Sequence, residues 1–197
     1  MENKNTDLGY IIYDKHVAFW GSPLSNFYPC EFSGCLDGIK VFFEEAINKD
    51  LMDLNNFKWK SSEQCFMAQK AATFMDVKSL LEIMLKTERP EEAKKLGRKV
   101  KDFNDNVWSM VRKIHMKNVV YAKFSQNKDL KNFLLSPDFE GKDFVEGSPF
   151  DGVWGVKLDY RNPDIDNPEN WNGENLLGKV LNEVREKLKE DGKEDIN

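Results

Sequence analysis

The pattern of apolar and polar positions changes along the chain, from short runs before residue 61 to a helical period after it. The early apolar runs are bounded by Gly and Pro residues, which is typical of strands and loops. They cover residues 17–20, 30–32, 39–43 and 57–59, and the polar stretch 44–56 between them is interpreted as an insertion or a short helix. From Ser61 onwards apolar residues recur every three to four positions, which predicts helices.

Six helices are predicted after this change of period. The first begins at the capping box Ser61-Ser62-Glu63-Gln64, and the third begins at Pro90, a residue favoured in the first turn. The predicted helices cover residues 62–74, 77–86, 90–97, 104–124, 127–135 and 174–190, and strand character returns at 144–146 and 153–158. Because strands and helices cluster apart and do not alternate, the fold class is α+β: a helix-dominated compact single domain with a few short strands.

Composition fits one folded domain. The chain has 197 residues, of which 40% are apolar and 12% aromatic, and this excludes a chain held open by its charge. The domain is predicted to cover residues 17–190, between an N-terminal segment (1–16) and a charged tail (191–197). The net charge of −5 argues against a protein built to coat a phosphate backbone. No apolar stretch reaches the roughly 18 residues of a membrane span and no secretory signal is visible, so we expect a cytoplasmic protein without a membrane partner.

Cysteine and histidine usage limits the chemistry. The three cysteines (Cys30, Cys35 and Cys65) are too few for a disulfide framework, and the two histidines lie far apart in sequence. No spacing matches a zinc site, so neither a metal nor a cofactor is expected. Catalysis is therefore expected to use carboxylates, lysine, amides or hydroxyls.

The first candidate pair is Glu63 and Lys70. Seven residues on a helix are two turns, so both side chains leave the same face, together with Phe66. Burial of either charge alone is unfavourable. One interpretation is a carboxylate that interacts with the helix dipole and a lysine whose amine reaches water. The other is an acid and an amine that face one pocket.

Two glycine-containing segments are the next candidates. Asp151 lies in a Gly/Pro-rich turn three residues before Trp154, where an acid can meet a flat ring; a turn residue and a core anchor are the alternative. The second segment, 171–178, has small and amide residues at a helix start, whose backbone N–H groups near Gly173 to Asn175 are a candidate phosphate site or only a helix cap.

A loop at 21–29, rich in amide, hydroxyl and aromatic groups, suits a sugar or a base.

The order of these segments resembles the NADAR (YbiA-like) family over residues 19–189. The resemblance is carried by Ser25-Asn26-Phe27-Tyr28-Pro29, by Ser61-Ser62-Glu63 with Ala68-Gln69-Lys70, and by Asp151-Gly152-Val153-Trp154-Gly155, with supporting segments at 93–98, 123–127 and 175–179. It implies a helix-rich α+β domain with N-glycosidase activity, which cleaves the bond between a ribose carbon and an amine nitrogen.

The resemblance also implies site residues and substrates. It implies that Glu63, Lys70 and Asp151 are catalytic, in one cleft with Trp154. The residues expected to bind substrate are Asn26, Phe27, Phe66, Arg98, Trp154, Gly155 and Asn175. Phe66 and Trp154 would stack on the base and Arg98 would hold phosphate. Two substrate classes follow: ADP-ribose on guanine in nucleic acid, which we favour, and phosphorylated ribosylamino-pyrimidine intermediates of riboflavin synthesis.

Two departures from the family pattern and one rival function remain. Gln64-Cys65-Phe66-Met67 stands where the family often has His-Tyr-Phe-Gln, and the segment 39–60 is longer than usual. Both bear on substrate choice. A reader of ADP-ribose or nucleic acid without turnover would use the same pocket, but a pure reader needs no buried acid and amine.

Overall fold

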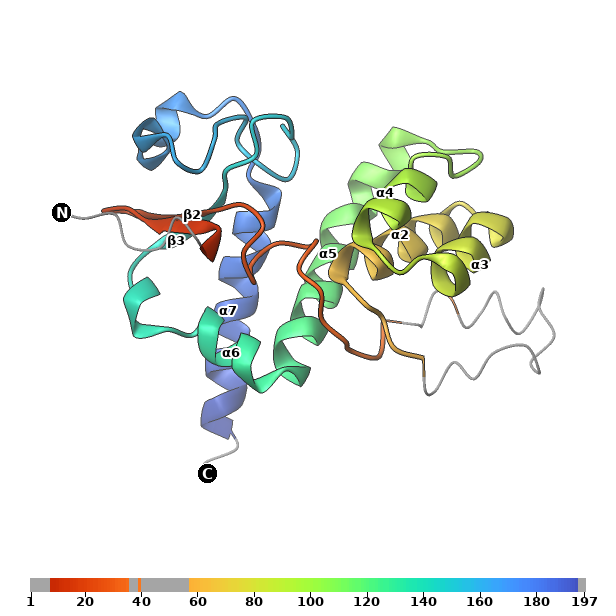
Figure 1. Ribbon diagram of the computed structural model, residues 1–197, viewed down its shortest axis with the longest axis horizontal. Coiled ribbons are helices and arrows are strands. Elements are labelled where there is room, and N and C mark those ends of the chain that lie inside the picture. Colours follow the sequence, from red (N-terminus) through yellow and green to blue (C-terminus); the bar gives the residue numbers. More distant parts are fainter. Residues whose placement is uncertain (1–7, 36–38, 40–56, 195–197) are drawn as a thin grey trace. The chain divides into compact units, whose positions relative to one another are not determined.

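The computed structural model describes residues 8–35, 39 and 57–194, which form two compact units (Figure 1). The first unit comprises residues 1–28 and 128–197, and the second comprises residues 29–127. We call them the sheet unit and the helical unit, after their main elements.

The sheet unit is built on three short strands in the order β1-β2-β3. Strand β1 (Tyr10–Ile12) pairs antiparallel with β2 (His16–Phe19), with Tyr10 opposite Phe19. Strand β2 pairs parallel with β3 (Asp143–Glu146), with Phe19 opposite Glu146. The central strand is β2, all four residues of which are buried. The sheet therefore joins the beginning of the chain to a segment more than 120 residues later.

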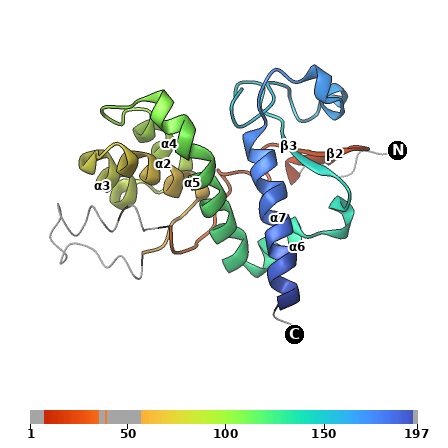
Figure 2. The same ribbon diagram turned by 180° about the vertical axis from the view of Figure 1, so that it is seen from behind.

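Helix α7 (Leu176–Glu194) covers one face of this sheet and packs on β3 (Figure 2). Its buried face consists of Leu177, Val180, Leu181, Val184 and Leu188. Helix α6 (Lys128–Leu134) and the 3-10 helix η3 (Pro137–Phe139) lead into β3. Ring centroids of Tyr10, Phe133, Phe139 and Phe144 lie 5.3–5.7 Å apart in edge-to-face contacts. These contacts join both elements to the strands.

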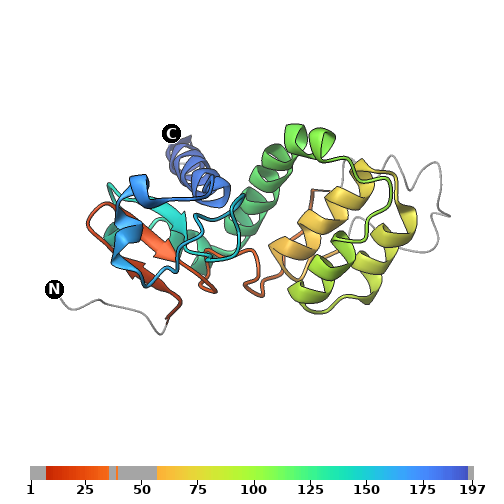
Figure 3. The same cartoon turned by 90° about the horizontal axis from the view of Figure 1, so that it is seen from above.

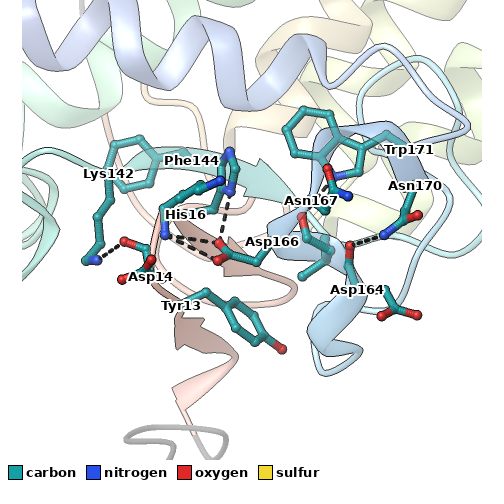
Figure 4. Close-up of polar contacts among 12 residues, drawn as sticks. Tyr13, Asp14, His16, Lys142, Phe144, Asp164, Asp166, Asn167, Asn170 and Trp171 are labelled. Atoms are coloured by element: carbon teal, nitrogen blue, oxygen red, sulfur yellow. Dashed lines mark hydrogen bonds and ion pairs between the residues drawn. The ribbon is translucent and has the colours of Figure 1, made fainter.

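The segment after β3 is fastened to the start of β2 (Figure 4). Asp166, at the end of the 3-10 helix η4 (Pro163–Asp166), accepts the Lys15 backbone N–H and lies 3.0 Å from the His16 Nδ1 atom. The Trp171 ring packs edge-on to His16, with centroids 5.3 Å apart, and its Nε1–H donates to the Ile165 carbonyl. The 3-10 helix η5 (Pro168–Asn170) lies between η4 and Trp171 in the chain. This loop thereby brings the chain to the start of α7.

Helices make up most of the described part of the helical unit. Helix α2 (Ser62–Thr73) contacts α3 (Val77–Lys86), α4 (Pro90–Gly97) and α5 (Asp105–Gln126). Figure 3 shows α2, α3 and α4 side by side. The approach of α4 is close: a Cβ atom added to Gly97 would lie 2.0 Å from the Met67 sulfur. A residue larger than glycine at position 97 would force the Met67 side chain to move.

The start of α2 is fixed by side chains. The Ser61 hydroxyl accepts the Gln64 N–H at 3.1 Å, so Ser61 is the predicted N-cap. Gln64 reaches back one residue further than an ideal capping box requires, because its Oε1 accepts the Lys60 N–H at 2.8 Å. Its amide also donates to the Ile83 and Thr87 carbonyls. Gln64 therefore joins the start of α2 to the end of α3.

The structure confirms the α+β class, with helices dominant and few short strands. The six predicted helices are present with ends within two residues of those expected, except α7, which continues to Glu194. The strand expected at 153–158 is wrong, because residues 151–158 form bends and irregular backbone. The runs 30–32 and 57–59 form only the antiparallel bridge Phe32–Trp59, and β1 was not predicted. Most of the run 39–43 and all of 44–56 lie outside the described residues. Within the described part of the chain, no helix has the length and hydropathy to cross a membrane.

Lys123 is a buried charge in the helical unit. Its side chain, on α5, is 1% exposed, and its Nζ lies 4.9 Å from the centroid of the Phe124 ring. Burial lowers the pKa of Lys123 to about 8, although the neighbouring Cys30 acts in the opposite direction. The folded pKa is thus below the unfolded value of 10.5, and the unfolded chain binds more protons between these values. Stability from this group therefore rises with pH between about 8 and 10.5.

We expect the wild-type protein to gain stability relative to Lys123→Met as the pH rises. From pH 7 to pH 10 the wild type should gain about 2–3 kcal/mol relative to the variant, at about 1.4 kcal/mol for each pH unit between the two pKa values. Urea unfolding of both proteins at several pH values measures the difference. Both should carry Cys30→Ser, because burial raises the pKa of the Cys30 thiol and its titration has the opposite effect. A constant difference would contradict a buried amine with a lowered pKa.

Candidate functional site

Glu63 and Lys70 leave the same face of α2, as the spacing predicts. Glu63, in the first turn, is only 5% exposed, and Lys70, two turns later, is half-buried. Burial lowers the pKa of Lys70, and the charges of Asp105 and Glu63 offset that effect only in part. The amine therefore loses its proton at a lower pH than an exposed lysine does. This is the condition under which a lysine acts as a nucleophile.

Aromatic rings surround the Lys70 amine. Its Nζ lies 3.9 Å from the centroid of Phe103 and 6.0 Å from that of Trp108, distances at which a ring face attracts a cation. Phe74 packs against both rings, with centroids 5.2 Å from Phe103 and 6.4 Å from Trp108. Of these three side chains, Trp108 is buried and Phe103 is 43% exposed. The amine is thus held at an aromatic surface, and one ring of that surface is open to solvent.

Two further rings complete this group. Phe66 is 2% exposed and packs against Trp108 at 5.1 Å between centroids, and His115 stacks on Trp108 at 5.8 Å with an interplanar angle of 18°. Burial lowers the pKa of His115, which favours its neutral form. We call Phe66, Phe74, Phe103, Trp108 and His115 the aromatic cluster. Only Phe66 was expected at the site, although Trp108 and His115 show the same seven-residue spacing on α5 as Glu63 and Lys70 do on α2.

Asp151 organises a tight turn in the sheet unit. Its Oδ1 accepts the backbone N–H groups of Val153 at 2.9 Å and Trp154 at 2.8 Å, and its own N–H donates to the Ser148 hydroxyl. This is the local hydrogen bonding by which Asp favours turns over strands, and it explains why no strand forms at 153–158. Asp151 and Trp154 are both partly exposed, so Trp154 is not a fully buried anchor.

The start of α7 is bonded to this turn. The N–H groups of Glu174 and Asn175 donate to the Gly152 and Gly155 carbonyls at 2.9 and 3.2 Å. The expectation that these two N–H groups hold a phosphate is therefore wrong, because carbonyl oxygens already accept both of them. The turn is also tightly packed: a Cβ atom on Gly173 would lie 2.3 Å from the Gly155 oxygen. The segment before α7 therefore packs closely on the turn that Asp151 organises.

Asn175 supports the same turn from within. It is 3% exposed and has a φ of +52°, a left-handed conformation that Asn adopts more readily than most residues. Its Oδ1 accepts the Glu146 N–H at 3.1 Å, and its Nδ2 donates to the Phe144 carbonyl at 3.0 Å. Asn175 therefore connects the end of β3 to α7, and its expected role in binding substrate stays a prediction.

The other predicted residues are distributed over both units. Asn26 is buried and Phe27 is partly buried, in a loop of consecutive turns. In this loop the Ser25 hydroxyl accepts the Phe27 N–H. Arg98 is exposed at the C-cap of α4. The sheet unit contains Asn26, Phe27, Asp151, Trp154, Gly155 and Asn175, and the helical unit contains Glu63, Phe66, Lys70 and Arg98. Among the described residues, no group of three His, Cys, Asp or Glu side chains is placed to hold a metal ion.

Substitution of Asp151 separates its structural contribution from its charge. Asp151→Asn retains an acceptor oxygen for the two N–H groups, so the melting temperature should stay within about 2 °C of wild type. Asp151→Ala removes the acceptor, and we expect it to lower the free energy of unfolding by about 1–2 kcal/mol. Thermal and urea unfolding of both variants tests this. Equal stabilities of the Ala and Asn variants would show that the hydrogen bonds to Asp151 do not hold the turn.

Comparison with known proteins identifies the family and the fold. The family model described as NADAR domain matches residues 16–189. An N-glycosidase of Acanthamoeba polyphaga mimivirus is 35% identical over 182 residues, which cover 88% of this chain and 96% of that protein. A riboflavin biosynthesis protein of Vibrio vulnificus is 32% identical over 168 residues, covering 85% of this chain and 35% of that protein. The NMR structure of the E. coli protein YbiA is similar in fold, with a TM-score of 0.63 and 25% identity over 94% of this chain and 91% of that one.

Proposed function

This chain belongs to the NADAR family, and on that premise we propose that it is an N-glycosidase that removes ADP-ribose from guanine bases of nucleic acid. The relative from mimivirus bears the name N-glycosidase, which supports the hydrolysis of an N-glycosidic bond. One observation carries the proposal: a nearly buried carboxylate and a lysine of lowered pKa lie on one face of α2, against aromatic rings.

The reaction requires charge to be balanced at two atoms. As the bond between the ribose C1 atom and nitrogen breaks, positive charge develops at C1 and negative charge on the leaving nitrogen. We propose that Glu63 moves the proton that the leaving nitrogen needs, as a general acid. We assign the second carboxylate, Asp151, to stabilise the positive charge at C1. The fixed turn around Asp151 supports that assignment, because a charge that is already oriented needs no rearrangement during the reaction.

Lys70 offers a covalent route. An N-linked ribosylamine opens to an iminium at C1 as its ring oxygen takes a proton from Glu63. The neutral Lys70 amine then adds to C1 and gives a proton back to Glu63, which passes it to the leaving nitrogen, and the base departs as an amine. Lys70 is then bound to C1 as a Schiff base, which water hydrolyses to release the sugar and the free amine. In a direct route water attacks C1 and Lys70 acts only through its charge. We favour the covalent route, because burial has lowered the pKa of this amine.

Substrate binding is assigned to side chains of suitable chemistry. Trp154 is partly exposed and Phe103 is 43% exposed, so both rings offer a face to a base. Phe66 is buried against Trp108, so we assign it to support of that ring. Arg98 is exposed and carries a planar cation that suits phosphate. Asn26, Phe27, Gly155 and Asn175 complete the proposed binding set. A cytoplasmic location remains a prediction from the sequence.

One alternative substrate has specific support. The relative from Vibrio vulnificus is named a riboflavin biosynthesis protein, which favours phosphorylated ribosylamino-pyrimidine intermediates. The same carboxylate and amine would act on either compound, since both contain a ribose C1–nitrogen bond. A reader of ADP-ribose without turnover is the alternative from another class. Such a protein gains nothing from an amine of lowered pKa.

Separate incubations distinguish these functions. The protein is mixed with an oligonucleotide that carries ADP-ribose on guanine and, separately, with the phosphorylated pyrimidine intermediate, and the products are identified by mass spectrometry. We expect free ADP-ribose and unmodified oligonucleotide from the first mixture. Asp151→Asn, which keeps the turn, should lower this release. Binding of the modified oligonucleotide without release of sugar would show that the protein is a reader of ADP-ribose and not a glycosidase.

A further inference from the structure

Two cysteines meet beside α2 in the helical unit. Cys65 lies on α2, two residues after Glu63, and is fully buried, whereas Cys35 lies at the end of the loop 33–35 and is partly exposed. The two side chains are in hydrogen-bond contact. They are far apart in sequence, so this contact depends on how the loop is held against the helix.

Two helices and the bridge residue Trp59 hold that loop through their side chains. The Gln69 amide, one turn after Cys65 on α2, donates to the Cys35 carbonyl. Gln126, at the end of α5, exchanges two hydrogen bonds of 2.8 Å with the backbone of Ser33. The Trp59 Nε1–H donates to the Gly34 carbonyl at 2.8 Å. Residues 33–35 are therefore fixed by three separate side chains, and the two thiols are kept together.

The surroundings of the two thiols differ in a way that sets an order of reaction. Burial, together with the contact to Cys35, raises the pKa of Cys65 well above its ordinary value, so this thiol is a poor first nucleophile. Cys35 is the accessible member of the pair. An accessible thiol next to a second, resolving thiol is the arrangement of reversible oxidation sites.

We propose that Cys35 and Cys65 are a site of reversible thiol oxidation, which a small disulfide such as oxidised glutathione converts to an intramolecular disulfide. The Cys35 thiolate attacks oxidised glutathione, forms a mixed disulfide and releases one glutathione thiolate. The Cys65 thiol then attacks the Cys35 sulfur, loses its proton and releases the second glutathione. Two protein thiols are oxidised, and one glutathione disulfide is reduced to two thiols.

The disulfide would fasten the loop to the helix that carries Glu63 and Lys70. It closes a chain segment from residue 35 to residue 65 and so restricts the unfolded state. We expect the oxidised form to melt about 5–10 °C above the reduced form. The site is independent of the proposed glycosidase reaction, because neither thiol takes part in it.

Mass spectrometry of the native protein tests the proposal. After treatment with oxidised glutathione and alkylation of remaining thiols, we expect the intact mass to show loss of two hydrogen atoms and one alkylated cysteine. Trypsin should give peptide 16–40 joined to peptide 61–70. Because Cys30 lies in the same tryptic peptide as Cys35, the matched control is Cys30→Ser, which should form the same link.

The cysteine variants make the assignment decisive. Cys65→Ala, which retains a small buried side chain, should stop at a mixed disulfide between Cys35 and glutathione, and Cys35→Ser should form neither product. A wild-type protein that stops at the mixed disulfide would overturn the proposal. So would a link that persists in Cys35→Ser, or a disulfide that leaves the melting temperature unchanged and that dithiothreitol does not reverse.

Discussion

Glu63→Gln should lower turnover by about two to four orders of magnitude, the range of general acid–base catalysis, while the protein stays folded. The amide has the shape of the carboxyl group but cannot supply the proton that the leaving nitrogen requires. Glu63 is 5% exposed, so a neutral side chain of the same shape should be accommodated in the first turn of α2. Single-turnover release of sugar from the modified oligonucleotide measures the effect.

The matched control is Glu82→Gln on α3. It makes the same chemical change in the same unit, at a carboxylate 3.9 Å from the Lys86 amine on the surface. Surface ion pairs contribute about 0–1 kcal/mol, so this variant should keep the melting temperature within a few degrees and retain full turnover. Near-normal turnover of Glu63→Gln would instead leave Glu63 as a carboxylate that only interacts with the helix N-terminus.

Lys70→Arg should lower turnover on the order of a thousandfold or more if Lys70 is the nucleophile. Arginine keeps the positive charge over the Phe103 ring but does not lose a proton, so it cannot form a Schiff base. The wild-type protein, treated with borohydride during the reaction, should retain the sugar fragment on Lys70. Peptide mapping by mass spectrometry locates this adduct.

Other lysines provide the internal comparison for this experiment. Lys123 also has a lowered pKa, of about 8, but it is 1% exposed, and Lys94 and Lys179 belong to segments that carry the family resemblance. An adduct on any of these three lysines would show that Lys70 is not the nucleophile. An active Lys70→Arg variant without any adduct would show direct hydrolysis by water, with Lys70 acting through its charge.

The pH dependence of the rate follows from the same amine. Only neutral Lys70 adds to C1, and burial has lowered its pKa, so the rising limb of the pH–rate profile should end below the ordinary lysine pKa of 10.5. Loss of the Glu63 proton sets the falling limb. A pH series with the wild-type protein measures the single-turnover rate and locates the pH at which it stops rising. A rate that still rises in proportion to hydroxide up to pH 10.5 would contradict an amine with a lowered pKa.

Local chemistry made most of the helices predictable. Ser61 and Pro90 mark helix starts through interactions within one turn, so the sequence alone places them correctly. The turn at Asp151 shows the limit of such patterns. Residues 153–158 have strand-like apolar content, but the Asp151 carboxylate takes two of their N–H groups, and a ladder cannot form there. The hydrogen-bonding capacity of one side chain outweighed the apolar pattern.

Contacts between distant segments were not predictable. The parallel pairing of β2 with β3 joins residues more than 120 positions apart, and nothing in either run specifies the partner. The environment of Lys70 has the same origin. Its helix face was predicted, but the rings of Phe103 and Trp108 come from the segment around the start of α5, and the pairing of α2 with α5 is a tertiary contact. Periodicity identifies a face, not what packs on it.

Competition between the two candidate substrates distinguishes the proposed activity from its alternative. The guanine-ADP-ribosylated oligonucleotide and the phosphorylated ribosylamino-pyrimidine are mixed at equal concentration with wild-type protein or with Glu63→Gln, and mass spectrometry follows both substrates over time. We expect the wild type to convert the oligonucleotide first, to release ADP-ribose and to restore guanine, and we expect Glu63→Gln to release almost none. Consumption of the pyrimidine alone, or of neither substrate, would contradict it.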